Sequence, residues 1–130
     1  ETLSIMKKVI ASPLAPKAVG PYSQAIEHDS KTLYISGQLP IDGATGKMAE
    51  GIEAQTRRSL DNLGHILSEA GYGFGDIAKT TFLLSHISDF AAMNAVYAEY
   101  FPGDKPARIC FEVAALPMGA LVEIDAVAVK

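Results

Sequence analysis

The spacing of apolar residues between Gly51 and Gly71 constrains the fold of this chain more than any other feature. The apolar side chains in this stretch follow the helical period that lets one face be buried; they are Ile52, Leu60, Leu63, Ile66, Leu67 and Ala70. Glycine readily adopts the left-handed backbone with which many helices end. We therefore predict an amphipathic helix over residues 51–70 that ends at Gly71.

Short runs rich in β-branched and aromatic residues on both sides of this helix predict strands. They cover residues 5–11, 22–27, 32–38, 76–86, 106–114 and 121–129. The polar segment 28–31 is short enough for a hairpin. A second helix is expected over residues 88–101, with Ser88 as its N-cap. This order predicts an α+β fold in which two helices pack on one face of a mixed, six-stranded sheet.

The length of 130 residues and the 48% hydrophobic content fit one continuous core, so we expect a single domain over residues 1–130. Met6 resembles a natural start, and residues 1–5 are therefore interpreted as an extension or a tag remnant. No apolar run approaches the ~20 residues that span a bilayer, and the first residues lack a secretory signal. We expect a cytoplasmic protein without a membrane partner.

The charged and metal-binding residue types argue against two further classes of protein. The net charge is −4 and the basic residues are scattered, whereas nucleic-acid binding usually needs a concentrated basic face. The single cysteine, Cys110, excludes an internal disulfide, and the three histidines show no metal-ligand spacing. We therefore expect neither a nucleic-acid partner nor a metal site.

The last two predicted strands leave one sheet face without a cover. Residues 121–129 carry apolar side chains on both faces, and two helices cannot cover both faces of one sheet. An exposed apolar face favours association, so we expect other copies of the chain to bury it. In residues 106–114 the alternation of side chains gives two sets, one on each face of the strand. We expect the helices to meet Ile109, Phe111 and Val113, and the opposite face to carry Arg108, Cys110 and Glu112.

Two charged residues interrupt these apolar strands. Arg108 lies on the face expected to be buried between copies, where an unpaired charge costs on the order of 3 to 5 kcal/mol and therefore needs an anion. A structural salt bridge with Glu112 or Glu123 and a bound ligand are both compatible with this position, and residue type alone favours the salt bridge. Glu123 is equally compatible with an edge position that reaches water and with a functional role.

Each of three further residues has an ordinary structural explanation when it is considered alone. Asn94 shares a helical stripe with core residues, which favours a hydrogen-bonded structural amide. Cys110 projects from the same face as Arg108 but has no neighbouring histidine to activate it, so we interpret it as part of a wall. Tyr22 follows a Gly-Pro pair at the entry to a strand, where a surface or core role is the default.

Taken together, six blocks of the sequence resemble the Rid family (also called YjgF or L-PSP) of enamine/imine deaminases, and its RidA-like branch in particular. They are GPYSQ at 20–24, SGQLP at 36–40, AQTRRSLDN at 54–62, DIAKTT at 76–81, MNAVYAEYF at 93–101, and residues 106–129. The blocks occur in the family's order and extend over nearly the whole chain from Met6. The resemblance implies a chorismate-mutase-like fold and a homotrimer, whose sheets form a central barrel and whose active sites lie between subunits.

The activity implied by this resemblance is that of a 2-iminobutanoate/2-iminopropanoate deaminase, a hydrolase without metal or cofactor. Its substrates are 2-aminoacrylate, 2-aminocrotonate and their imine tautomers, which serine and threonine dehydratases release and which are hydrolysed to 2-keto acids and ammonia. The family's positions imply that Arg108 binds the substrate carboxylate and that Glu123 is a functional residue. We hypothesise that Glu123 orients and deprotonates the attacking water. The implied substrate-binding residues are Tyr22, Ser36, Gly37, Asn94 and Cys110. Some relatives have a longer loop at residues 101–105, which leaves the size of the substrate open.

Two other functions remain open from the sequence. Ribonuclease or translation-inhibitor activity is also ascribed to relatives, although the acidic composition and the lack of a histidine pair argue against it. A non-catalytic regulator that binds small carboxylic acids would use Arg108 equally well.

Overall fold

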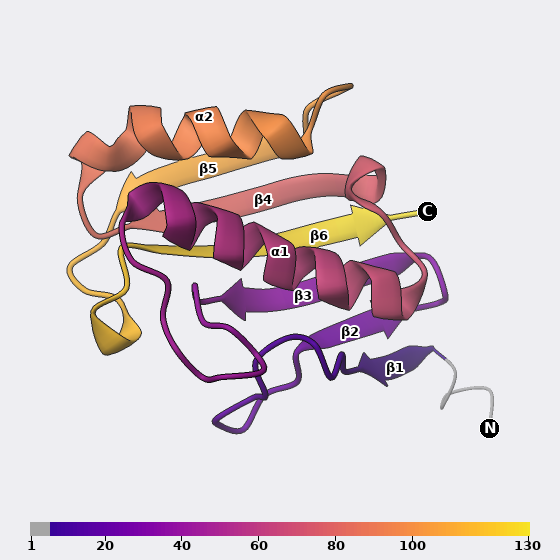
Figure 1. Ribbon diagram of the computed structural model, residues 1–130. Helices are drawn as coiled ribbons and strands as arrows, with labels where there is room; N and C mark the ends of the chain where they lie inside the picture. The colour runs from indigo at the N-terminus through magenta and orange to yellow at the C-terminus, as the bar shows by residue number, and fades with distance from the viewer. Residues whose placement is uncertain (1–5) are drawn as a thin grey trace.

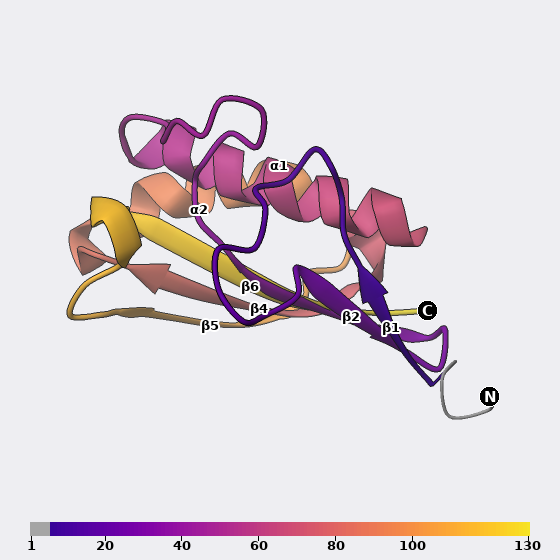
Figure 2. The ribbon, with the colours of Figure 1, turned by 90° about the horizontal axis from the view of Figure 1, so that it is seen from below.

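The computed structural model describes residues 6–130 as two layers, a six-stranded sheet and a pair of helices (Figure 1). The strands are β1 (Lys7–Ile10), β2 (Ala25–His28), β3 (Thr32–Gln38), β4 (Ile77–Leu84), β5 (Ala107–Glu112) and β6 (Val122–Val129). The helices are α1 (Ile52–Ala70) and α2 (Phe90–Tyr100). Both lie on the same side of the sheet, as Figure 2 shows, so the predicted α+β class is confirmed. The expected strand start at Ile5 and the interpretation of residues 1–5 lie outside the described residues.

The order of strands across the sheet is β1-β2-β3-β6-β4-β5. Neighbouring strands are antiparallel except β4 and β5, which are parallel. Parallel neighbours need a crossover connection, and α2 provides it. The consequence is that β5 becomes an edge strand lying alongside α2 (Figure 1).

The first helix ends as the sequence predicts. Gly71 adopts a left-handed backbone with φ of 82°, and its N–H donates to the carbonyl of Ser68. The predicted apolar stripe forms the centre of the core, where the most deeply buried members are Leu60, Leu63, Ile66 and Leu67. None of the helices within residues 6–130 has the length and apolarity that crossing a bilayer requires.

Polar side chains of α1 hold the loops at one end of the sheet. The buried Gln55 accepts a hydrogen bond from the N–H of Leu121 at 2.8 Å. The buried Asn62 donates to the carbonyls of Leu39 and Ile41 at 3.1 and 2.8 Å. The helix therefore fixes the segments that follow β3 and precede β6.

The predicted N-cap at Ser88 is wrong. Residues Ile87–Asp89 form a short 3-10 turn, and α2 begins at Phe90 without a side-chain cap. The N–H of Ile87 instead donates to the carboxylate of Glu112 at 2.8 Å. A carboxylate from a distant strand thus satisfies a backbone donor at this end, a contact that local sequence cannot reveal.

The two faces of β5 are the reverse of the prediction. Ile109 and Phe111 lie on the helix-free face and are each 47% exposed, whereas Arg108 and Cys110 point toward α2. The register supports this placement, because Arg108 pairs with the fully buried Thr80 of β4. Alternation defines which residues share a face but not which face meets the helices. The prediction assumed that the apolar set points inward.

The helix-free face nevertheless carries large apolar side chains, as the sequence predicts. Those that are exposed and share this face through the strand register are Val9, Tyr34, Ile109, Phe111 and Val129. Exposed apolar patches of this kind usually mark a contact with another molecule.

Candidate functional site

The guanidinium of Arg108 is held between an amide and two aromatic rings of α2. Its Nη1 donates to Oδ1 of Asn94 at 2.7 Å. Its central carbon lies 4.9 Å from the ring centre of Tyr97 and 5.5 Å from that of Phe90. Ring faces attract cations, so these contacts stabilise and orient the charge without neutralising it.

No carboxylate of residues 6–130 forms an ion pair with Arg108. The structural salt bridge that residue type favours is therefore not formed with either Glu112 or Glu123. An arginine has five N–H donors, and most of those of Arg108 remain free for a ligand. The adjacent cavity of about 480 Å³ is lined by Asn94, Tyr97, Ala98, Lys105, Pro106 and Arg108.

The thiol of Cys110 lies two residues farther along β5 on the same face, but it does not line this cavity. Burial raises the pKa of the Cys110 thiol, and the nearby charge of Arg108 only partly opposes this effect. A neutral thiol is a poor nucleophile, so this environment argues against a nucleophilic role of Cys110. Residues 6–130 contain no group of three or more histidine, cysteine, aspartate or glutamate side chains placed to hold a metal ion.

A second cavity, of about 490 Å³, gathers four of the predicted residues: Tyr22, Ser36, Gly37 and Glu123. They come from the loop before β2, from β3 and from β6. The cavity also has apolar walls, supplied by Val19, Leu39, Pro117 and Met118. It combines one carboxylate with a largely apolar surface.

Gly37 makes room for the carboxylate of Glu123. The pairing of β3 with β6 shifts register between Ile35 and Gln38, so β3 bulges where Gly37 lies. A Cβ atom added at Gly37 would overlap the carboxylate and lie 2.9 Å from its carbon. Only glycine leaves this space to the acid.

The environment of Glu123 favours its protonated form. Burial raises the pKa of its carboxyl above the ordinary value, and the negative charge of Asp125 raises it further. Asp125 is fixed by the N–H of Thr81, which donates to its Oδ1 at 3.1 Å. A carboxylate with a raised pKa is a better proton acceptor near neutral pH than an ordinary one.

Ser36 fastens the loop that carries Tyr22. Its hydroxyl donates to the carbonyl of Ser23 at 2.6 Å, and its N–H donates to the carbonyl of Gln24 at 2.9 Å. The hydroxyl proton is therefore already used, and Ser36 can only accept a hydrogen bond from a substrate. Tyr22 is 49% exposed, and its hydroxyl accepts a bond from the N–H of Val19 at 3.3 Å.

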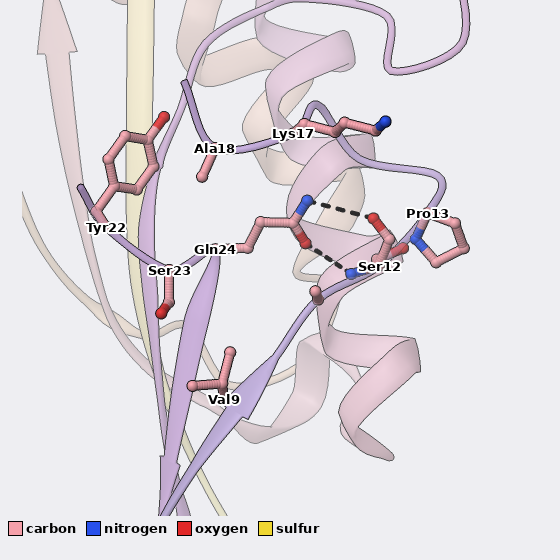
Figure 3. A pocket seen from close by; sticks show the side chains of 9 residues that line it. Val9, Ser12, Pro13, Lys17, Ala18, Tyr22, Ser23 and Gln24 are labelled. Carbon is pink, nitrogen blue, oxygen red and sulfur yellow. Dashed lines mark hydrogen bonds between the residues drawn. The ribbon is translucent and has the colours of Figure 1, made fainter. Parts of the chain in front are cut away.

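The same loop is also hydrogen-bonded to the segment that follows β1. Figure 3 shows the side chain of Gln24 bonded to the backbone of Ser12, with the N–H of Ser12 donating to its Oε1 at 2.6 Å. The Tyr22 ring lies apart from this pair, at the far end of a cavity of about 470 Å³. Buried hydrogen bonds thus anchor the backbone on which the exposed tyrosine stands.

The structure does not bring Arg108 and Glu123 together within one chain. Glu123 pairs with Leu83, which pairs with the exposed Phe111, so Glu123 faces the helix-free side while Arg108 faces α2. Two strand spacings and three residues separate their Cα atoms, which corresponds to about 14 Å with side chains on opposite faces. One small molecule cannot contact both groups of a single chain.

Some residues around these groups were missed by the sequence reasoning. Phe90 and Tyr97 lie on the same helical stripe as Asn94, which the sequence analysis interprets as facing the core, and their spacing from Asn94 was a readable signal. Asp125 lies two residues after Glu123, which in a strand means the same face and was a readable signal. The contact of Gly37 with Glu123 had no local signal, because it joins two strands.

The comparisons with known proteins agree with this fold. The model of a family described as Endoribonuclease L-PSP matches residues 12–130. The chain therefore belongs to the L-PSP family, also known as the YjgF or Rid family, and the resemblance found in the sequence is confirmed.

Individual relatives are similar over nearly their whole length. The 2-iminobutanoate/2-iminopropanoate deaminase of Mus musculus is 47% identical over 128 residues, which cover 98% of this chain and 94% of the relative. A RutC family protein of Pyrococcus horikoshii is 51% identical over 96% of this chain and 99% of its own length. The structures of E. coli TdcF with bound serine and of the E. coli YjgF gene product both superpose with a TM-score of 0.91. They are 37% and 41% identical, and each alignment covers 95% of this chain and 98% of the other.

Proposed function

We propose that this protein is a 2-iminobutanoate/2-iminopropanoate deaminase, which hydrolyses reactive enamines and imines to 2-keto acids and ammonia. The observation that carries the proposal is the Arg108 guanidinium, which Asn94 and two rings orient and which no carboxylate of residues 6–130 neutralises. The names of the mammalian relatives, at 44–47% identity, support the same activity.

Carboxylate recognition by Arg108 is the first step. The substrates carry a carboxylate beside the C=N carbon, and a planar guanidinium can bind it through two parallel hydrogen bonds. The single bond to Asn94 fixes the orientation of the guanidinium and leaves other donors for the substrate. Because the fold already orders this side chain, substrate binding need not supply the free energy for ordering it.

Hydrolysis then requires water to add to the C=N carbon. Glu123 takes a proton from this water while the new C–O bond forms, which gives a tetrahedral carbinolamine. This proton passes to the imine nitrogen, and the hydroxyl proton of the carbinolamine then moves through Glu123 to the same nitrogen. The C–N bond breaks as the C=O bond of the keto acid forms, and ammonia leaves. Backbone groups near Gly37 and Cys110 hold the nitrogen end, and Tyr22 and Ser36 contact the substrate. These steps need neither a metal nor a cofactor, since the imine already reacts with water.

The active site is shared between copies in a homotrimer. Arg108 and Asn94 of one subunit meet Glu123, Tyr22 and Ser36 of its neighbour. Two observations support this arrangement: the two groups lie on opposite faces of one chain, and the helix-free face is apolar and exposed. A neighbouring copy would cover that face and complete the site at the same time.

The test couples the purified protein to a serine or threonine dehydratase and follows keto-acid release while semicarbazide competes for the imine. Wild type should accelerate release, and Arg108→Ala should lower kcat/KM by roughly 30- to 1000-fold, because truncating one side of a charged pair costs about 2 to 4 kcal/mol. Arg57→Ala is the matched control, since that arginine forms an exposed ion pair with Glu99. Full activity of Arg108→Ala would refute the carboxylate role.

Two further assays of the same purified proteins would point to other functions. The family description names an endoribonuclease, and RNA cleavage that is lost in Arg108→Ala would support that activity. Binding of 2-keto acids without any acceleration of imine decay would instead support a regulator that uses Arg108 only for recognition.

A further inference from the structure

The backbone of Met118 has a conformation that its residue type does not favour. Its φ and ψ are 59° and 21°, in the left-handed region where a side chain costs about 1 kcal/mol or more. Within residues 6–130, two other non-glycine residues have positive φ, Asp29 and Ser30, and both lie in the hairpin between β2 and β3. Hairpin turns require that geometry. Met118 lies outside any hairpin, so its conformation needs another explanation.

Neighbouring residues hold the turn that carries Met118. This turn, Pro117–Gly119, lies between β5 and β6 and is the gold turn at the left of Figure 1. The hydroxyl of Ser85 donates to the carbonyl of Ala120 at 2.5 Å, and the N–H of Leu121 donates to Gln55 at 2.8 Å. Such anchors allow an unfavourable backbone conformation to persist, and conformations of this kind concentrate at ligand sites.

The side chain of Met118 projects from this turn into the wall of the candidate site. It is 70% exposed, yet it lines both cavities that share Tyr22 and Gly37, one of about 490 Å³ and one of about 80 Å³. The larger of the two contains the Glu123 carboxylate. Contact with water stabilises an exposed thioether little, but the flexible side chain can pack closely against an irregular apolar ligand.

We propose that Met118 is a specificity-determining residue, which contacts the substrate side chain and favours 2-imino acids with larger apolar side chains. This inference rests on the proposed deaminase function. The methyl group of 2-iminopropanoate is too short to extend past Glu123, whereas the isobutyl group of the imine derived from leucine can reach the apolar wall. Val19, Leu39, Pro117 and Met118 form that wall.

The experiment compares two imines generated by an amino-acid oxidase from alanine and from leucine. Its readout is the ratio of kcat/KM for the leucine imine to that for the alanine imine. Met118→Ala should lower this ratio about tenfold, since one to two lost apolar contacts in a pocket correspond to factors of that size. Met118→Leu, which conserves volume, should retain the ratio. Met6→Ala is the matched control, because Met6 precedes β1 and lines neither cavity.

A glycine variant separates the side chain from the backbone. Met118→Gly removes the side chain and also relieves the left-handed strain, so it should show the same low ratio as Met118→Ala. If Met118→Gly kept the wild-type ratio, the ratio would not depend on the Met118 side chain and the proposal would be overturned. An unchanged ratio in Met118→Ala would overturn it as well.

Binding measurements distinguish this inference from the proposed function. Titrations of wild type and Met118→Ala with pyruvate and with 4-methyl-2-oxopentanoate require no turnover. We expect Met118→Ala to weaken binding of the larger keto acid about tenfold and to leave pyruvate affinity nearly unchanged. If wild type hydrolyses no imine, the deaminase function fails, and this affinity ratio still decides the role of Met118.

Discussion

The candidate site has two parts, one around Arg108 (the Arg108 half) and one around Glu123 (the Glu123 half). The surroundings of each residue act on its charge in a different way. On the helix side of β5, Asn94 and two aromatic rings orient a cation and leave its charge unpaired. On the opposite side of the sheet, the Glu123 carboxylate lies against the bare backbone of Gly37. Its pKa is raised by burial and by Asp125. The first half is suited to binding an anion and the second to accepting a proton.

The Arg108 half lacks a proton acceptor and the Glu123 half lacks a cation, because the two groups are kept apart within one chain. A carboxylate placed beside Arg108 would pair with it, which would lower the pKa of the acid and block the anion site. Positioning the two groups on opposite faces of one chain prevents this pairing. In the proposed trimer, contact between copies would bring them within reach of the same substrate.

Mixing two inactive variants should give the largest effect. Arg108→Ala and Glu123→Gln should each lose nearly all activity, the latter because a lost general base costs about 10²- to 10⁴-fold. If each site combines residues from two copies, coexpressed subunits in equal amounts should restore about one quarter of the sites by random assembly around a closed ring. The measurement is keto-acid release by the purified mixed assembly.

Homogeneous assemblies of each variant, mixed only at the time of assay, serve as the control for this experiment. They should stay inactive as long as subunits do not exchange. A coexpressed assembly that contains both variants and shows no recovery would contradict the shared site.

Gly37→Ala should have an intermediate effect and tests the Glu123 half alone. The added Cβ would overlap the carboxylate, which must rotate away, and a displacement of this size can lower kcat by about 10- to 100-fold. Thermal stability should change little, because Gly37 does not have a positive φ. Gly103→Ala is the matched control, since its Cβ would meet no atom within 4 Å. Equal rates for the two variants would contradict the role assigned to the contact.

Asp125→Asn should have the smallest effect, a shift of the pH profile. Glu123 acts as a base only when ionised, so activity is present above its pKa and is lost as the pH falls through it. Asp125 raises that pKa, and removing its charge should lower it, which moves the acid limb of kcat to lower pH. Asparagine retains the Oδ1 that accepts the N–H of Thr81, so the backbone contact is conserved. An acid limb that stays in place or moves to higher pH would argue against Glu123 as the base.

Much of the fold could be predicted because its signals are local. The apolar stripe of α1 and the left-handed Gly71 follow from helical periodicity and from the freedom of glycine. The extent of β3 agrees with the prediction residue for residue. The start of α2 could not be predicted, because the donor at Ile87 is satisfied by Glu112 from another strand.

The structure shows where the predicted site residues lie, and this arrangement could not be predicted from the sequence. Arg108 and Asn94 are together, and Tyr22, Ser36, Gly37 and Glu123 line one cavity. The prediction nevertheless placed Arg108 on the wrong face of the sheet. Both faces of this sheet carry apolar side chains, some of them buried and others exposed. Polarity alone therefore could not identify the face that meets the helices.

The sequence by itself determined the order of strands and helices, the residues that share each face, and the family to which the chain belongs. These properties depend on periodicity and on residue types near one another along the chain. Only the tertiary structure decided which face each charge occupies, that Arg108 lacks an acidic partner within residues 6–130, and that Gly37 leaves space for Glu123. Those properties depend on contacts between distant strands and helices, which local periodicity does not specify.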